Sequence, residues 1–349
     1  MTIKDIARKA GVSTATVSYV INKTRHVSPE RTKRVMDVLE ETGYQPDQVA
    51  KTLRTGESRI IGVLVEDVLA FSSSRIINGI SEHIESTDYR ILLSDLRMLD
   101  NLRNQYDQIV YQKEKVNKAL SDMVYGERVD ALIYIGTFDR DISDIISNMK
   151  RPTVIAYSTA EEDEHLCSVT YENEAISAEV ASHLIDAGHT QIAVITGLIH
   201  TTPAQTRLKG IKQTVKERGL TLDPNLVKHG DWERESGYLC MQDILKAEKE
   251  DLPTAVLAMN DLMAIGAMDA IREANLRVPE DISVVGFDNR EASDLVFPRL
   301  TTVEIDLKEV GLIAAQMVIE KLKGNGKYVD ERNVVVPSRL IRRDTVMKR

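Results

Sequence analysis

Positive charge is concentrated at the start of the chain, where clustered Lys and Arg side chains could contact phosphate groups. Residues 1–36 carry a net charge of +6, whereas the whole chain of 349 residues carries −9, so the remainder carries −15. A small basic head on a large acidic body predicts that only the head approaches nucleic acid. The charged residues of the head are Lys4, Arg8, Lys9, Lys23, Arg25, Arg31, Lys33 and Arg34 against Asp5 and Glu30.

Catalytic chemistry has much weaker support in the sequence. No Gly-x-Gly-x-x-Gly follows the first expected strand, and neither a P-loop lysine nor a Gly-x-Ser-x-Gly elbow occurs. The seven histidines show no metal-ligand spacing, and Cys167 and Cys240 lie far apart. We therefore expect two buried thiols, no disulfide, no metal and no cofactor. An enzyme remains an alternative, but a binding protein fits the residues better.

The composition is that of an ordinary globular protein, with 42% hydrophobic and 28% charged residues. A chain of this length suits two or three domains. No apolar run approaches the roughly 20 residues of a membrane span. The first residues lack the apolar core of a signal peptide, so we expect a cytoplasmic protein that does not contact membranes.

Three short helices are predicted to carry the basic head. Thr2 is expected to cap the first helix and Gly11 to end it, because glycine accepts the positive φ of a helix C-terminus. Ser13 is expected to cap the second helix, and Ser28 the third, with Pro29 as its first residue. Two short helices joined by a turn containing Gly are typical of a helix-turn-helix, although a generic three-helix bundle gives the same pattern.

The residue identities are more specific than the helical pattern, and they resemble the LacI/GalR family of repressors. The resemblance implies a helix-turn-helix head over residues 1–46, a hinge over 47–58, and an effector-binding and dimerisation domain over 59–349. In the head it is carried by Ile6-Ala7, Ala10-Gly11-Val12-Ser13, Thr16-Val17-Ser18, Asn22, Val27-Ser28, Arg31, Val35, Gly43-Tyr44 and Pro46.

The resemblance implies that the second helix lies in the major groove of DNA. Thr14, Ala15 and Tyr19 would face base edges there. Relatives often carry Arg where this chain has Tyr19, and Tyr cannot make the bidentate contact to guanine. The full set of expected DNA contacts in the head is Thr2, Ser13, Thr14, Ala15, Thr16, Ser18, Tyr19, Asn22, His26 and Ser28.

The hinge segment at 47–58 is expected to link DNA binding to the body. The resemblance implies a helix that folds on DNA and inserts Leu53 into the minor groove, with Ala50 one turn earlier. At this length an isolated helix is marginal in water. The alternative is a passive tether.

The body predicts an α/β fold, because short apolar strands alternate with helical segments. We expect two doubly wound parallel-sheet lobes like those of periplasmic binding proteins. One lobe would comprise 59–157 and 303–336, and the other 158–302 and 337–349. The expected strands are 60–65, 90–93, 131–135 and 153–156 in the first lobe, and 168–170, 191–195, 255–258 and 283–287 in the second.

A small molecule is expected between the lobes, beyond the carboxyl ends of the strands. The resemblance implies that Arg207, Asn260 and Asp288 contact it, since their side chains suit hydroxyl groups or purine edges. Trp232, the only tryptophan, would offer a flat apolar face, or would merely pack the lobe. Further candidates are Phe71, Ser72 and Ser73, on a loop after the first strand, and Asn173.

Together these features predict a sequence-specific regulator, a repressor in the family pattern. It would bind a near-palindromic double-stranded operator as a homodimer under the control of a sugar, nucleoside or related metabolite. A transport-type binding protein, or a regulator controlled by a phosphorylated carrier protein, are the alternatives. The segment 97–128 is longer than in relatives, and its apolar spacing predicts one or two amphipathic helices.

Overall fold

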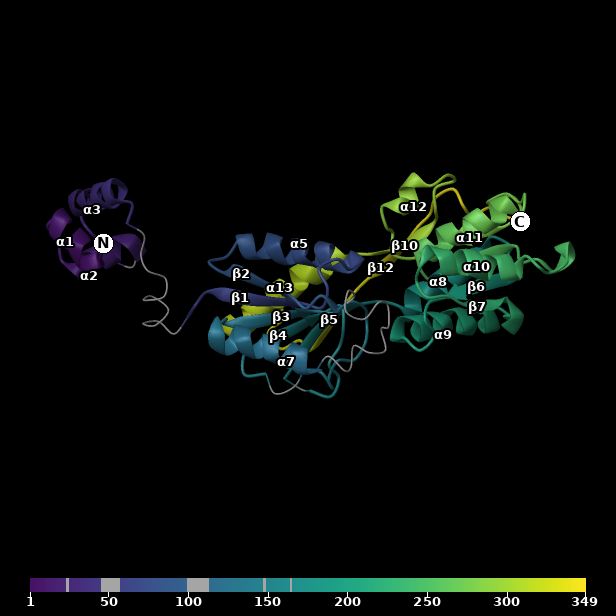
Figure 1. Ribbon diagram of the computed structural model, residues 1–349, viewed down its shortest axis with the longest axis horizontal. Coiled ribbons are helices and arrows are strands. Elements are labelled where there is room, and N and C mark those ends of the chain that lie inside the picture. The colour runs from purple at the N-terminus through teal and green to yellow at the C-terminus, as the bar shows by residue number, and fades with distance from the viewer. Residues whose placement is uncertain (23–24, 45–56, 99–112, 147–148, 164) are drawn as a thin grey trace. The chain divides into compact units, whose positions relative to one another are not determined.

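The chain divides into two compact units, Met1–Ser58 and Arg59–Arg349. Each unit has its own buried core. The expected hinge residues Ala50 and Leu53 lie outside the described residues. The computed structural model describes residues 1–22, 25–44, 57–98, 113–146, 149–163 and 165–349 (Figure 1).

The secondary structure described in the first unit is helical. Thr2 caps the first helix through reciprocal hydrogen bonds with Asp5, and Gly11 ends it with φ 63°. Ser28 precedes the third helix, but its side chain makes no capping hydrogen bond, so that expectation is wrong. Pro29 has no N–H, which leaves one donor fewer to satisfy. The helices are α1 (Ile3–Ala10), α2 (Thr14–Asn22) and α3 (Pro29–Thr42), packed around Ile6, Ala7, Ala10, Val17 and Val35.

The second unit begins with a six-stranded parallel sheet that forms a first lobe. Its strand order is β11-β5-β4-β3-β1-β2. The central strands are apolar along their whole length because both faces of the sheet are covered. The strands are β1 (Ile60–Val65), β2 (Arg90–Asp95), β3 (Ala131–Ile135), β4 (Thr153–Ala156), β5 (Cys167–Tyr171) and β11 (Asn333–Val336).

The strand β5 corrects the expected lobe boundary. Residues 158–171 were assigned above to the second lobe, but β5 pairs with β4 and with β11 in the first sheet. The first crossing between lobes therefore follows Tyr171 instead of lying near 157–160. A short apolar strand does not reveal in its own residues which sheet it joins, because that depends on pairing with distant segments.

Helices cover both faces of this sheet (Figure 1). On one face α5 (Phe71–Glu85) packs closely against α13 (Leu307–Lys323). A Cβ at Gly79 would lie 1.9 Å from the Lys308 carbonyl oxygen, so this approach requires glycine. On the other face lie α7 (Lys113–Ser121) and a π-helical turn, η2 (Asp122–Gly126).

The helix α7 and the turn η2 account for part of the long 97–128 segment. Val116, Leu120 and Met123 are buried against the sheet, so this part of the segment contributes to the core. The amphipathic pattern is therefore confirmed for 113–126. Residues 99–112 lie outside the described part.

A four-stranded parallel sheet, with strand order β7-β6-β8-β9, forms the second lobe. Its strands are β6 (Ile192–Thr196), β7 (Val227–His229), β8 (Ala255–Ala258) and β9 (Ser283–Val285). Its helices are α8 (Glu174–Asp186), α9 (Thr202–Glu217), α10 (Arg234–Ile244), α11 (Asp261–Glu273) and α12 (Ala292–Leu295), with short 3₁₀ turns η3 (Pro224–Leu226) and η4 (Lys249–Asp251).

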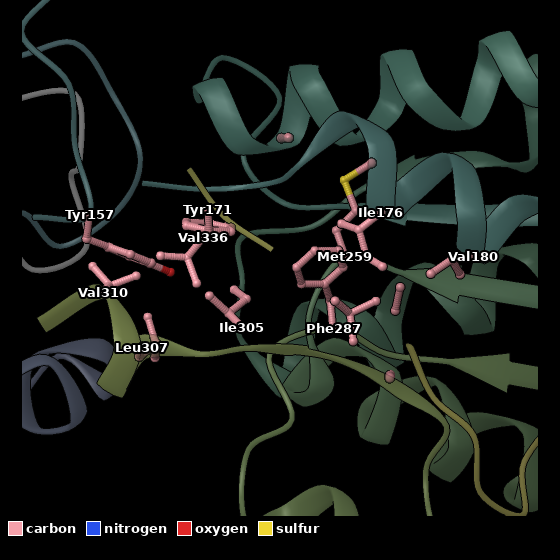
Figure 2. Packing of buried hydrophobic residues seen from close by; sticks show 14 of the residues in the cluster. Tyr157, Tyr171, Ile176, Val180, Met259, Phe287, Ile305, Leu307, Val310 and Val336 are labelled. Atoms are coloured by element: carbon pink, nitrogen blue, oxygen red, sulfur yellow. The ribbon is translucent and has the colours of Figure 1, made fainter. Parts of the chain in front are cut away.

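Two antiparallel strands connect the lobes, β10 (Thr302–Ile305) and β12 (Ser338–Ile341). Figure 2 shows buried side chains running from Tyr157 and Leu307 past Ile305 to Phe287, so one apolar cluster extends through both lobes. The chain then returns to the second lobe, where the Thr345 hydroxyl donates to the Val284 carbonyl at 2.6 Å.

Both cysteine thiols are free, although only one is fully buried. Cys167 is buried in β5, whereas Cys240 in α10 is half-buried, so the expectation of two buried thiols holds only for the first. Within the described ranges, no helix combines the length and apolar character needed to cross a bilayer.

Candidate functional site

The first turn of α2 gathers most of the DNA-contact candidates of the head. Thr14 and Ala15 are exposed at the start of this helix. The Ser13 hydroxyl accepts from the Thr16 N–H at 3.1 Å, so Ser13 caps the helix, and it lies 2.9 Å from the Thr16 hydroxyl. The helix N-terminus thus presents small, exposed side chains, which suits a DNA surface.

The other head candidates lie in varied surroundings. Tyr19 is half-buried, and the Arg25 guanidinium lies 5.2 Å from its ring centroid. His26 and Ser28 are exposed beyond the helix, Ser18 is half-buried, and Thr2 is engaged with Asp5. The side chain of Asn22 is outside the described part. Beside Ser13 and Thr16 lies a hollow of about 500 Å³, lined also by Ala7, Arg8, Gly11, Val12, Arg31 and Arg34.

A cavity of about 270 Å³ lies between the two lobes. Segments that follow strands of both sheets line it, as expected for ligand sites in open parallel sheets. Five aromatic rings contribute to its wall, so a flat ligand would find apolar faces. The lining residues are Leu69, Ala70, Phe71, Thr137, Phe138, Tyr157, Tyr171, Thr201, Pro203, Arg207, Trp232, Glu233, Asn260, Leu262, Asp288 and Arg290.

Five of the eight expected effector residues line this cavity, namely Phe71, Arg207, Trp232, Asn260 and Asp288. Ser72 and Ser73 do not: they lie in the first turn of α5, not on a loop, and are fully buried. The Ser73 hydroxyl donates to the Asp67 carbonyl at 2.7 Å, which holds the turn before the helix. The expected loop is therefore wrong, because α5 already begins at Phe71.

Arg207 is held by several partners deep in the second lobe. Its Nε donates to Asn173 at 2.8 Å, and its Nη1 donates to the Met259 carbonyl at 2.5 Å. Its Nη2 donates to the Tyr171 hydroxyl, at 3.2 Å, on the first lobe's β5. The guanidinium carbon lies 3.5 Å from the Phe287 ring centroid. Arg207 is thus fixed in place before any ligand arrives.

Asn173 does not line the cavity but holds Arg207, which does. It is buried, its amide oxygen accepts from Arg207, and its amide nitrogen donates to Asp139 at 2.9 Å. Because Asp139 follows β3 of the first lobe, this chain of hydrogen bonds connects the lobes. Burial raises the pKa of Asp139 to about 6, although Asn173 and Arg207 oppose that rise.

Asp288 lies between two guanidinium groups. Its carboxylate is 4.0 Å from Arg207 Nη1 and 3.3 Å from Arg290 Nε. Burial raises the pKa of Asp288, while Arg290, Arg207 and Arg75 favour the charged form. Its φ of 103° is unusual for a residue with a side chain, and such strain is common at binding sites.

Asn260 lines the cavity but is largely committed to the protein. Its side-chain oxygen accepts from the Met263 N–H at 2.8 Å, and thus caps α11. Its amide nitrogen donates to the Trp232 carbonyl at 2.7 Å. Trp232 has φ 77°, so this hydrogen bond holds a strained backbone that places the indole in the cavity.

Several lining residues were absent from the sequence-based set. Tyr157 and Tyr171 stack with ring centroids 5.0 Å apart, and each lies at the end of a strand. Phe138 and Arg290 follow β3 and β9. Their positions directly after apolar strands could have identified them in the sequence, since the carboxyl ends of parallel strands lie at one edge of the sheet.

A buried ion pair supports the wall that contains Thr137 and Phe138. Glu66, after β1, accepts from the Thr137 N–H at 2.8 Å, from the Tyr134 hydroxyl at 2.5 Å and from Arg140. Arg140 also stacks on Phe138, 4.9 Å from its centroid. Burial opposes the charge of Glu66, but Arg140 and these hydrogen bonds hold its pKa below the usual value.

Replacing Gly197 with alanine is expected to displace Trp232 from the cavity. A Cβ at Gly197 would lie 2.0 Å from Cε2 of the indole, so one of the two must move. We expect a loss of about 1–3 kcal/mol in unfolding free energy from overpacking. Tryptophan fluorescence reports the displacement, since Trp232 is the only tryptophan. Gly126→Ala is the control, because open space surrounds that position. Unchanged emission in Gly197→Ala would contradict the packing.

Asp261 is expected to make stability depend on pH. Burial and the charge of Asp288 raise its pKa to about 7, although the Thr302 hydroxyl and the Arg290 N–H donate to it. A carboxyl whose folded pKa is raised binds a proton that the unfolded chain releases. Its contribution to stability is therefore complete below about pH 4 and is lost as pH rises through 7.

The Asp261→Asn variant tests this dependence. It cannot ionise, so its unfolding free energy should fall less than that of the natural protein between pH 4 and pH 7, by up to about 1.4 kcal/mol per pH unit. Urea unfolding, followed by Trp232 fluorescence at several pH values, measures the difference. Parallel pH profiles of the two proteins would show that Asp261 does not titrate in this range.

Comparison with known proteins matches both units. Residues 2–47 match the model of bacterial regulatory proteins of the lacI family, and residues 181–346 match the periplasmic binding protein-like domain. The chain is 34% identical over 349 residues to the HTH-type transcriptional repressor PurR of Pasteurella multocida (strain Pm70), covering 100% of this chain and 99% of the relative. It is 33% identical to the PurR repressor of Haemophilus influenzae (strain PittEE), covering 98% of each.

Solved structures show the same architecture. The Lac repressor dimer bound to operator and the anti-inducer ONPF superposes with a TM-score of 0.81 at 28% identity, over 99% of each chain. The helix-turn-helix head and the two parallel-sheet lobes predicted from the sequence are thereby confirmed. The chain therefore belongs to the lacI family of bacterial regulatory proteins, which are DNA-binding transcriptional repressors.

Proposed function

We propose that this repressor binds a near-palindromic operator as a homodimer and that a small molecule in the cavity between its lobes controls operator affinity. The carrying observation is the 270 Å³ cavity, which both lobes line and which contains Arg207, Asp288 and Trp232. A ligand that contacts both lobes shifts the equilibrium between the open and the closed arrangement of the lobes. The relative with a solved structure is a dimer bound to operator and an anti-inducer, which supports the proposal.

For the head, we propose that Thr14, Ala15 and Tyr19 face base edges. Ser13, Thr16, Asn22, His26 and Ser28 would contact phosphates, with Thr2 and Ser18 nearby. Arg8, Arg31 and Arg34 border the hollow beside Ser13 and extend this set. Ala50 and Leu53 complete the proposed DNA contacts from the sequence pattern alone. In this proposal the protein acts in the cytoplasm on DNA and leaves its ligand chemically unchanged.

The test is operator selection from random DNA, followed by footprinting with and without candidate metabolites. We expect two protected half-sites about one helical turn apart, and affinity that falls steeply with salt because the head is basic. A thermal-shift screen of sugars, nucleosides and purines would identify the effector class. Protection of one isolated half-site by a monomer would contradict the dimer. Operator affinity that no small molecule changes would contradict the effector.

A further inference from the structure

Arg290 differs from the other charged groups of the cavity because its hydrogen-bonding capacity is largely unused. Its Nε lies 3.3 Å from Asp288, and its backbone N–H donates to Asp261. Among the residues described, no group accepts a hydrogen bond from its two Nη atoms, which carry four N–H donors. Arg207, by contrast, has three of its five donors occupied by the protein.

The plane of the Arg290 guanidinium is fixed across the cavity. Its central carbon lies 4.2 Å from the ring centroid of Phe71, on the first turn of α5 in the first lobe. Arg290 itself follows β9 in the second lobe, so this cation–π contact joins the two lobes. With one face held by an aromatic ring, the free edge is preorganised for a planar or tetrahedral anion.

Charged groups of both signs lie in and around the cavity. Arg207 and Arg290 line the cavity, and Arg75, one turn after Phe71, acts electrostatically on Asp288. Against these three guanidinium groups stand the buried Asp288, the exposed Glu233, and Asp139, whose carboxyl interacts electrostatically with Arg207. Asp261 adds a partial negative charge near neutral pH, since its pKa is about 7. Carboxylates therefore offset the guanidinium groups, and the feature that favours an anion is the unoccupied Nη edge of Arg290.

We infer that the effector carries a carboxylate or phosphate group, and that Arg290 binds this anion while Phe71 holds the guanidinium from the other lobe. This inference rests on the proposed effector function and names the chemical class of the ligand. An anion on Arg290 is held by a side chain of the second lobe that also contacts Phe71 of the first lobe. Arg290 is then a specificity-determining residue that rejects neutral analogues. In the competing interpretation, Arg290 only neutralises Asp288.

The experiment compares matched neutral and anionic compounds by Trp232 fluorescence and calorimetry on the full chain. The pairs are D-glucose with D-glucuronate and with glucose 6-phosphate, and adenosine with adenosine 5′-monophosphate. Inorganic phosphate and acetate are also titrated against chloride at constant ionic strength. We expect at least one of the two simple anions to bind saturably. In any pair that binds, the anionic member should bind at least about tenfold more tightly. The pair members distinguish a carboxylate from a phosphate.

Variants assign the preference to Arg290. Arg290→Gln should weaken anion binding about 10- to 100-fold, and the preference for the anionic over the neutral member of a pair should be lost. Arg290→Lys keeps the charge but loses the fork, so its anion affinity should lie between the two. Arg299→Gln is the control, because Arg299 is exposed and pairs with Asp344 and Asp294 outside the cavity.

Three results would overturn the inference: neither anion binds, neutral members bind as tightly as anionic ones, or Arg290→Gln retains the full preference. A neutral compound that changes operator affinity would leave the proposed function standing while this inference fails. Failure of every compound to change operator affinity would contradict the proposed function, whatever the anion titrations show.

Discussion

Replacing Arg207 with alanine is expected to destabilise the second unit by about 3–5 kcal/mol and to abolish binding of the effector. The guanidinium is buried and lies 4.0 Å from Asp288, so its loss leaves a buried carboxylate with one cationic partner fewer. The Met259 carbonyl and the Asn173 amide oxygen also lose their donor. Unsatisfied buried polar groups and unpaired buried charges are among the most costly consequences of a single substitution.

Urea unfolding of the full chain, followed by Trp232 fluorescence, measures this loss in the second unit. Arg218→Ala is a matched control near the end of the same helix, where Arg218 pairs with Asp186 in an exposed position and should contribute less than about 1 kcal/mol. Arg207→Lys should recover little, because lysine lacks the planar fork that reaches three partners. A loss of less than about 1 kcal/mol in Arg207→Ala would show that the network contributes little to folding.

The sequence predicted cavity residues best where the residues beside them in the sequence are distinctive and the side chain itself lines the cavity. Arg207, Asp288 and Trp232 lie in distinctive sequence surroundings and all line the cavity. Asn260 was also identified, but its role is different: the side chain caps α11 and holds the backbone of Trp232. Residue type alone could not distinguish a ligand contact from a cap, since an amide group serves either purpose.

What the sequence could not supply is pairing between distant segments. The residues of β5 predict a strand, but only hydrogen bonding to β4 and β11 places it in the first lobe. Arg290 was not predicted for the same reason, because its role depends on contact with Phe71, which lies more than two hundred positions earlier in the sequence. Local patterns specify elements and their ends, whereas the partners across a cavity follow from the topology.

The ion pair between Glu66 and Arg140 was not predicted, and its removal should have an effect as large as that of Arg207. Glu66 is fully buried and Arg140 nearly so, which leaves no water to replace a lost partner. Glu66→Gln keeps the shape of the side chain but removes its charge. We expect it to lower the unfolding free energy by about 3–5 kcal/mol, because Arg140 would remain buried without a counter-charge.

A double-variant cycle isolates this pair from general damage to the core. Arg140→Met alone should also be strongly destabilising, whereas Glu66→Gln combined with Arg140→Met should recover part of the loss, since no unpaired charge remains. Glu82→Gln, which breaks an exposed pair with Lys308, is the control and should cost less than about 1 kcal/mol.

Because the folded pKa of Glu66 is lowered, its contribution to stability is present above its unfolded pKa and is lost as pH falls through the folded value. The difference between natural protein and Glu66→Gln should therefore shrink in acid. The Thr137 N–H donates to Glu66, and Thr137 and Phe138 line the cavity. The variants that lose stability should therefore also bind the ligand more weakly. Additive losses in the two single variants would show that the pair acts as two independent groups, and that the cavity wall is held by packing alone.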